Sequence, residues 1–280
     1  MKKLWIYIAL AMLGAGIGLF VTLCFMVDFD YSRFNNMKLV TNTYEITEEF
    51  HSVSIDTITA DVDIRPAEDG KCRIICHELE KILHNVQVKD GKLEISAKDE
   101  RKWTDHLFFF GSESPKVTVY LPECDFEEFK VDNTTGNITL IGSWNLQTMS
   151  LKTTTGDIAV SGTDCTQKVF VSVTTGCISM NDLNCGQLTI DGSTGEVKMT
   201  DVMANGDIQV RVTTGEIRLD RCDAAALDLK ATTGDICATL LTEKQISAHS
   251  TTGEVDIPQS TAGGKCVINT TTGDIRVNIG

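Results

Sequence analysis

The stretch LKTTTGDIAV, residues 151–160, decides the fold, because the chain repeats it with small changes at a fixed interval. A repeat period of about 20 residues is typical of solenoids, in which each repeat forms one coil that stacks on the next. The sequence therefore predicts an all-β fold, a single β-solenoid of eight coils over residues 126–280. Aligned on their glycine, the copies centre on Gly136, Gly156, Gly176, Gly195, Gly215, Gly234, Gly253 and Gly273.

Apolar residues keep fixed places around each glycine. Two residues after it stands a β-branched apolar residue in every copy, from Ile138 to Ile275, and apolar residues also stand five and seven places before it. Alternation at period two predicts two short strands in each repeat, one on each side of the glycine. The inward positions are −7, −5, −3, −1, +2 and +4, so the parity changes at the glycine. The chain must bend there, where glycine tolerates a positive φ.

Threonine occupies both positions before each glycine, except that Ser193 replaces one of them. The parity predicts that the threonine nearest the glycine, such as Thr155, points inward and bonds to its counterpart or to backbone groups of the bend. The other threonine of each pair is expected to point outward. A hairpin with a two-residue Gly-X loop at each site fits the same parity and stays open as an alternative architecture.

Residues 51–125 are expected to form degenerate N-terminal coils and a cap. The segment VSIDTITADVDIRP, residues 53–66, resembles a coil with Ala60 in the place of the glycine. NVQVKDGKLEIS, residues 85–96, predicts a hairpin around Asp90 and Gly91. CRIICHELEKIL, residues 72–83, fits a strand or a short helix, and HLFFFG, residues 106–111, is interpreted as a plug over the end of the core.

An uncharged segment occupies residues 4–27 and indicates a transmembrane anchor. As a helix it would span roughly 36 Å, enough for a bilayer core. No A-x-A-like cleavage site follows it, and Leu23 precedes Cys24 where a lipoprotein signal needs a small residue. Lys2 and Lys3 place residues 1–3 in the cytoplasm and the rest of this single-pass protein outside the cell membrane. Residues 28–50 are expected to form a stalk.

The charge and motif content argues against several functions. The chain has 25 Lys and Arg against 39 Asp and Glu, a net charge of −14, which disfavours nucleic acid as a partner. Its five histidines are dispersed, and no G-x-S-x-G, P-loop or H-E-x-x-H motif occurs. We therefore predict no catalytic residues, no cofactor and no metal site. A polysaccharide-active β-helix enzyme remains a less favoured alternative.

Two columns of the repeat carry further hypotheses. The residue after each glycine is acidic in six of eight copies, which predicts a solvated charge face, with calcium binding along Glu196 to Asp274 as the alternative. Cys165 and Cys185 occupy equivalent places in successive repeats, and stacking would bring them within disulfide range. The bridge is the minority hypothesis, to be tested by mapping their peptides without reduction.

The last repeat, ending TTGDIRVNIG at residue 280, has no polar cap in the sequence. We therefore expect the final coil to leave backbone groups unpaired and to pair with another copy or with a strand of a partner.

Taken in order, the N-terminal anchor, VSIDTITADVDIRP, VTVYLPECDFEEFKV and the serial TTGDI coils make the chain resemble the bacterial putative-adhesin β-strand-repeat family, a domain of unknown function in cell-envelope proteins. The resemblance covers roughly residues 45–280. It implies a β-solenoid-like domain without catalytic residues, and some relatives are linked to envelope-stress regions. The predicted function is a membrane-anchored binding, adhesin-like or scaffolding module with an envelope polymer or membrane protein as partner. An accessory role in an envelope-stress response through a membrane-protein partner is the alternative.

Overall fold

The computed structural model describes residues 7, 11–19, 21, 22, 39–99 and 114–280. The chain divides into two compact units, and the larger comprises residues 39–99 and 114–280. In the smaller unit the described residues before residue 23 are helical, and no described helix is long and apolar enough to cross a membrane. Half of the segment expected as an anchor at 4–27 lies outside the described residues. The aromatic plug expected at 106–111 lies wholly outside them.

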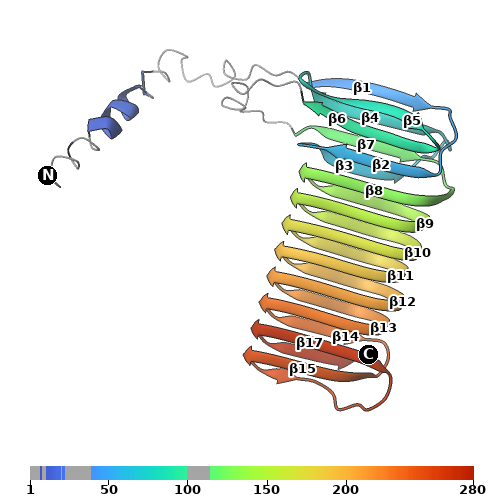
Figure 1. Cartoon of the computed structure of the whole chain (residues 1–280), viewed down its shortest axis with the longest axis vertical. Coiled ribbons are helices and arrows are strands. Elements are labelled where there is room, and N and C mark those ends of the chain that lie inside the picture. The colour runs from blue at the N-terminus through green and yellow to red at the C-terminus, as the bar shows by residue number, and fades with distance from the viewer. Residues whose placement is uncertain (1–6, 8–10, 20, 23–38, 100–113) are drawn as a thin grey trace. The chain divides into compact units, whose positions relative to one another are not determined.

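The larger unit consists of β-strands (Figure 1). They are β1 (Leu39–Ile46), β2 (Ser52–Thr57), β3 (Asp61–Pro66), β4 (Cys72–Leu79), β5 (Ile82–Lys89), β6 (Lys92–Asp99), β7 (Lys116–Leu121), β8 (Asp125–Thr135), β9 (Ile138–Thr155), β10 (Ile158–Thr175), β11 (Ile178–Thr194), β12 (Val197–Thr214), β13 (Ile217–Thr233), β14 (Ile236–Leu240), β15 (Lys244–Thr252), β16 (Val255–Asp256), β17 (Gly264–Thr272) and β18 (Ile275–Ile279).

Consecutive strands from β8 to β13 stack in parallel and in register, which Figure 1 shows as a regular pile of coils. Ile158 of β10, for example, pairs with Ile138 of β9 on one side and with Ile178 of β11 on the other. Hairpins would have produced antiparallel neighbours, so the hairpin alternative is wrong for the repeat. The predicted all-β solenoid is confirmed.

The repeat glycine bends each coil and also lies against its neighbour. Gly156 has a φ of 138°, a region that side chains rarely adopt. A Cβ atom added there would lie 2.2 Å from the carbonyl oxygen of Gly136 in the preceding coil. The predicted bend is therefore confirmed, and the close stacking of one glycine on the next excludes a side chain for a second reason.

The inward orientation predicted for the threonine nearest the glycine is wrong, whereas the other threonine of each pair is exposed as predicted. Thr154 and Thr155 are both exposed, and both threonine positions are exposed in the other seven copies too. The last inward side chain before the glycine is at position −3 instead of −1, because the chain already bends over the two residues before the glycine. There the buried Thr153 donates a hydrogen bond to the carbonyl oxygen of Gly136 at 3.1 Å, and Thr270 does the same to Gly234 at 3.1 Å. An inward hydroxyl does serve the bend, but from position −3.

Each coil also turns at places that the repeat does not reveal. Six residues after the glycine, the backbone again has a positive φ in five coils, at Gly142, Gly162, Asp182, Asp201 and Arg221. A register shift between Cys165 and Lys168 marks a further irregularity in β10, with counterparts in β11 and β12. One paired strand of up to 18 residues therefore runs from glycine to glycine, instead of the two short strands predicted for each repeat.

The order of the last three coils differs from the order in the sequence. β17 pairs with β13 on one side and with β15 on the other, and β18 likewise lies between β14 and β16. The C-terminal coil is thus inserted into the stack, and the preceding coil, β15 and β16, stands at the end. The prediction that the last coil leaves its backbone unpaired is wrong, and with it the reason for expecting self-association through that coil.

The other end of the stack changes from parallel to antiparallel pairing. β2 and β3 form a coil on β8 and β9, with Ala60 against Gly136 in the glycine column, as expected. β5 and β6 form the expected hairpin, with positive φ at Asp90 and Gly91. β4 and β1 pair antiparallel to each other, so CRIICHEL is a strand. Residues 39–50, assigned to the stalk by the sequence, belong to this folded unit, and Phe50 is in its core.

Candidate functional site

A cluster of polar side chains is buried at the end of the stack where β1, β2, β4 and β5 meet. Its centre is Glu78 of β4, which has no solvent exposure, together with His84 of β5, which is 4% exposed. Thr57 of β2 is also buried, and Asn42 and Tyr44 of β1 are partly buried. Inward-facing groups of this polarity require hydrogen-bond partners, because their desolvation is otherwise uncompensated.

Glu78 points inward because side chains alternate along β4, and the neighbouring strands bring its hydrogen-bond partners close to it. Cys72, Ile74, Cys76 and Glu78 are alternate residues of β4, and all four are buried. A turn at residues 80 and 81 then reverses the chain, and β5 brings His84 back against β4. β1 lies on the other side of β4, with Asn42 beside Cys76 in the antiparallel register. The carboxylate is therefore approached from two neighbouring strands.

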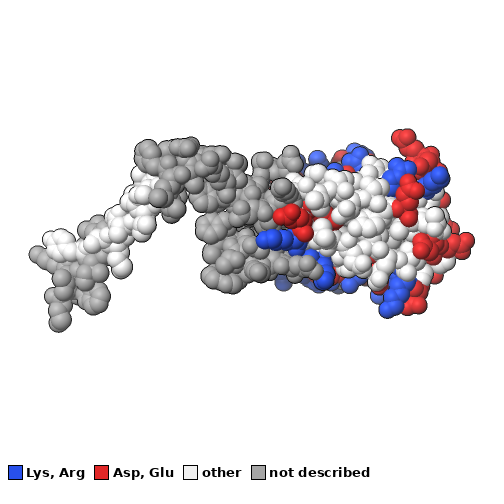
Figure 2. All heavy atoms as spheres, turned by 90° about the horizontal axis from the view of Figure 1, so that it is seen from above, with Lys and Arg blue, Asp and Glu red and all other residues white. Residues whose placement is uncertain are grey.

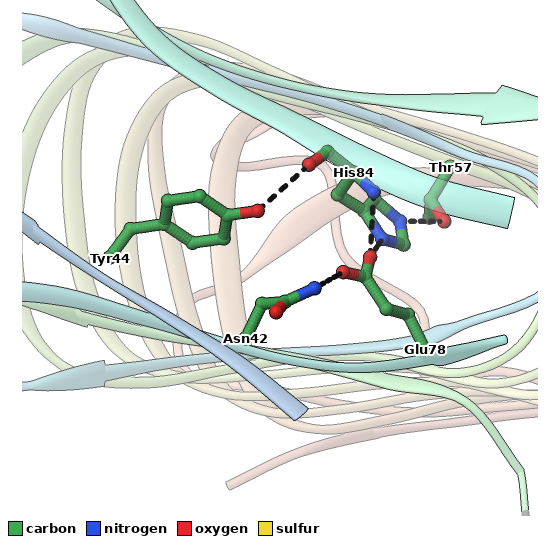
Figure 3. A network of polar contacts seen from close by, with 5 residues as sticks. All are labelled: Asn42, Tyr44, Thr57, Glu78 and His84. Carbon is green, nitrogen blue, oxygen red and sulfur yellow. Dashed lines mark hydrogen bonds and ion pairs between the residues drawn. The ribbon is translucent and has the colours of Figure 1, made fainter. Parts of the chain in front are cut away.

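Every oxygen of the Glu78 carboxylate is engaged (Figure 3). Nδ2 of Asn42 donates to Oε1 at 2.6 Å, and the backbone amide of His84 donates to Oε2 at 2.6 Å. Nδ1 of His84 also lies 2.6 Å from Oε2, and a carboxylate can only accept. The other ring nitrogen of His84 is 2.9 Å from Oγ1 of Thr57, while the hydroxyl of Tyr44 donates to the carbonyl of His84 at 3.2 Å.

Burial and the neighbouring carboxyl group keep nearby groups protonated. Burial, with an added contribution from Glu78, raises the pKa of the Cys76 thiol to about 12. Burial also raises the pKa of Tyr44, with smaller contributions from Glu78 and then Cys76. At neutral pH the thiol and the phenol therefore remain neutral donors, and neither is an activated nucleophile.

The donor set raises the question of a metal. Cys76, Glu78 and His84 offer sulfur, oxygen and nitrogen atoms within 4.8 Å of one another, a combination that suits zinc. Zinc would require loss of the thiol proton and separation of the 2.6 Å contact between His84 and Glu78. The carboxylate and the imidazole already satisfy each other and Asn42 and Thr57, so the residues fit a structural hydrogen-bond network better than a metal centre.

The sequence pattern did not predict this cluster. It treated the histidines as dispersed and left CRIICHELEKIL as a strand or a short helix. The signal that was available is the parity of Glu78, a carboxylate in an otherwise apolar inward column of Cys72, Ile74 and Cys76. Its partners could not be found in that way, because Asn42 lies 36 residues away and is brought near only by the pairing of β1 with β4.

The acidic column after the glycines has a structural use. Oδ1 of Asp157 accepts the backbone amide of Cys177 in the next coil at 2.7 Å, and Oδ1 of Asp274 accepts that of Glu254 at 2.9 Å. Likewise, Oδ1 of Asn137 accepts a hydrogen bond from the backbone amide of Asp157 at 2.8 Å. Within the described part of the chain, the column contributes no group of three ligands close enough for a metal ion. The short side chains connect one coil to the next across the bend.

Replacing Asp157 with alanine is expected to lower the free energy of unfolding by about 0.5–1.5 kcal/mol, because the amide of Cys177 loses its acceptor. Asp157→Asn keeps an oxygen in that place and should stay close to the wild-type value. Thermal and urea unfolding, each with and without millimolar calcium, measure both variants. An asparagine variant as unstable as the alanine variant, or a calcium-dependent melting temperature lost in both, would favour a cation site instead.

Cys165 and Cys185 lie side by side as a registered pair on β10 and β11, as their spacing predicts. Both are nevertheless free thiols, as are all nine cysteines that the structure describes, so the hypothesis of a disulfide between them is wrong. Burial raises the pKa of both thiols, that of Cys185 to about 12, with a smaller contribution from Cys165. They are small core residues rather than a redox pair.

The family follows from the repeat pattern and this stacking. The model of the Toastrack DUF4097 domain matches residues 50–170 and again residues 163–280. The chain belongs to the Toastrack DUF4097 family. The resemblance inferred from the TTGDI coils is thereby confirmed, and the two matches together cover the solenoid and its N-terminal end.

One solved structure shares the fold with a TM-score above 0.5. A protein from Bacteroides fragilis, described as a putative adhesin, is 18% identical, with a TM-score of 0.55 over 86% of this chain and 97% of the other. A protein from Parabacteroides distasonis, described as a putative lipid binding protein, is 16% identical, with a TM-score of 0.49 over 86% and 96%. No match was found among curated proteins. At these identities the likeness concerns the fold alone.

Proposed function

We propose that this Toastrack chain is a non-catalytic binding or scaffolding module of the bacterial cell envelope, held outside the membrane by residues 4–27. The observation that carries the proposal is the contrast between a closed interior and a regular outer surface. In the described part, the group of three close-lying Cys, Glu and His side chains, Cys76, Glu78 and His84, is buried where a substrate cannot reach it, and Glu78 and His84 are bonded to each other. Recognition must therefore use the outside of the stack.

One outer face offers the groups that bind polymers bearing hydroxyl and charged groups. A hollow of about 320 Å³ crosses β10 to β13 and is lined by Ser172, Thr174, Asp191, Arg211, Thr213 and Lys230. Arg211 approaches Asp191 and Asp228 only to 3.9 Å, and its side chain is 50% exposed. These side chains come from successive coils at the spacing of parallel strands, so a chain-like ligand could be bound by several coils at once.

Charged side chains of both signs are mixed on the surface at the β1 end of the stack. Seen from the β1 end, the described part is uncharged over much of its middle, and acidic and basic side chains lie together around the rim (Figure 2). The Bacteroides fragilis relative, described as a putative adhesin, is consistent with binding through such a surface. The ligand we propose is an envelope polymer or the exposed part of a membrane protein.

Retention on isolated envelope fractions tests this function. The chain, purified in detergent, is passed over peptidoglycan, anionic wall polymer and membrane-protein fractions. We expect saturable retention by one fraction, weakened by the paired change Arg211→Ala and Lys230→Ala. Retention of a membrane protein rather than a polymer would favour the accessory role in an envelope-stress response. Absence of saturable retention by any fraction would contradict a binding module.

Labelling of cysteines in intact cells tests the proposed location. Cys124 and Cys177 are exposed, whereas burial raises the pKa of Cys185 to about 12 and keeps that thiol unreactive. If the domain lies outside the membrane, a membrane-impermeant maleimide should label Cys124 and Cys177 in intact cells. A variant with these two and the partly exposed Cys237 replaced by serine should not be labelled at its other described cysteines, which are buried, until it is denatured. Labelling that requires cell lysis would place the domain inside.

A further inference from the structure

The inserted C-terminal coil leaves the preceding coil at the open end of the stack. β15 pairs only with β17, and β16 only with β18, among the strands that the structure describes. We propose that this end, formed by residues 243–256 and called here the open edge, binds an extended basic strand of a partner protein. The inference rests on the binding role proposed above and adds the place and the chemistry of one partner.

The apolar core is uncovered at the open edge. Val255 belongs to the column two residues after the glycine and is 42% exposed, whereas the other seven members of that column are at most 1% exposed. Ile246 and Ala248 of β15 are only partly buried, although their counterparts Leu227 and Leu229 in β13 are buried. A further strand laid on this edge would bury these groups as every inner coil does for its neighbour.

The backbone at the open edge lacks the acceptors that inner coils have. At each inner bend, the amides of the glycine and of the residue two places later donate to carbonyls of the next coil, as in Gly273 to Thr252 at 2.9 Å and Ile275 to Glu254 at 2.8 Å. The corresponding amides of Gly253 and Val255 face the open side, where no described strand follows. An extended segment can accept both, which is strand addition to a sheet edge.

The charge of the open edge indicates what kind of strand fits. Two inner coils pair an acid after the glycine with a base two residues later, Glu216 with Arg218 at 2.6 Å and Asp274 with Arg276 at 3.3 Å. The open edge has two acids at these positions, Glu254 and Asp256, and both are exposed. A second copy of this chain would bring the same acids to the same edge. A basic strand supplies the missing charge instead.

The nearest cationic side chains form no ion pair with Glu254 or Asp256 among the described contacts. Arg276 of β18 is registered beside Asp256, but its ion pair is with Asp274 at 3.3 Å. Lys244 is buried and bonded to Asp223 at 2.5 Å, and Lys265 belongs to the adjoining inner coil. His249 of β15 is exposed, but it lies seven residues before Asp256, on the other side of the bend.

Peptide binding to the full chain tests the proposal. The probe is a fluorescent form of residues 211–220 with both acids replaced by basic residues, RVTTGKIRLR, and the control peptide is its acidic counterpart, EVTTGEIELD. We expect saturable binding of the basic peptide by fluorescence anisotropy, and none of the acidic one. Asp256→Arg, which gives Glu254 a partner within its own coil, should weaken binding about ten-fold. Glu196→Arg makes the same charge change on an inner coil and should leave binding unchanged.

Three results would overturn the open-edge proposal. They are absence of binding of the basic peptide, equal binding by the Asp256→Arg and Glu196→Arg variants, and a dimer of the unmodified chain in sedimentation that Val255→Asp dissociates. The last result would show that a second copy fills the end. Retention on envelope fractions uses residues of another face, so it can succeed when the peptide fails, and the two proposals can be refuted separately.

Discussion

Replacing Glu78 with alanine is expected to lower the free energy of unfolding by about 3–5 kcal/mol, because it leaves several buried donors without their carboxylate acceptor. The ring and the amide of His84 and the side chain of Asn42 would all lose their acceptor without gaining access to water. Urea and thermal unfolding followed by circular dichroism measure the loss. Hydrogen exchange of β4 and β5 locates it, because a repeat protein can unfold in parts.

Glu80→Ala is the matched control, since Glu80 is an exposed carboxylate in the turn between β4 and β5. We expect it to change stability by less than about 0.5 kcal/mol. The double replacement Glu78→Leu and His84→Phe removes both polar partners and should recover much of the loss. If Glu78→Ala costs no more than Glu80→Ala, the buried network does not contribute to stability as we describe.

Replacing Gly215 with alanine is expected to cost about 3 kcal/mol, from backbone strain together with a steric clash. Its φ is 150°, and an added Cβ would lie 2.0 Å from the carbonyl oxygen of Gly195. Because that oxygen belongs to the backbone of the neighbouring coil, the clash cannot be relieved by a change of rotamer. Unfolding in urea measures the cost.

Gly192 provides the contrasting case in the same stack. It is not among the glycines with a positive φ, and an added Cβ would approach Cγ2 of Val212 at 3.5 Å, an ordinary contact. Its column holds Val173 and Val212 in the adjacent coils. Gly192→Ala should therefore stabilise the protein by about 0.4–1 kcal/mol. Equal effects at Gly215 and Gly192 would contradict the assignment of the repeat glycine to a tightly stacked bend.

The sequence predicted burial best at repeat positions that have the same environment in every coil. The column from Ile138 to Ile275 is apolar throughout, and the burial of all its members except Val255 at the open edge followed from that constancy. The threonine pair before the glycine is nearly as constant, yet the inward orientation predicted for the threonine nearest the glycine was wrong. A constant residue shows that the same environment recurs in every coil, but it does not show whether that environment is inside or outside the stack. The bend before the glycine begins two residues earlier than strict alternation implies.

Two features required the three-dimensional structure. The order of the last coils cannot be read from spacing, because Gly253 follows Gly234 by 19 residues and Gly273 follows Gly253 by 20, as in the regular coils. Coils with the same register can stack in either order. The buried network depends on Asn42, Thr57 and Glu78, which are far apart in the chain, and only Glu78 carries a local signal of its inward position.

The order of the last three coils is the claim from which the open edge follows, and cysteine cross-linking tests it most directly. Lys230 of β13 is registered with Asn269 of β17, whereas stacking in sequence order would place it beside His249 of β15. Paired parallel positions lie within disulfide range. The account predicts that oxidation joins the pair Lys230→Cys and Asn269→Cys, as seen by mass mapping without reduction, and fails to join Lys230→Cys and His249→Cys. The reverse result would contradict the inserted coil and remove the open edge with it.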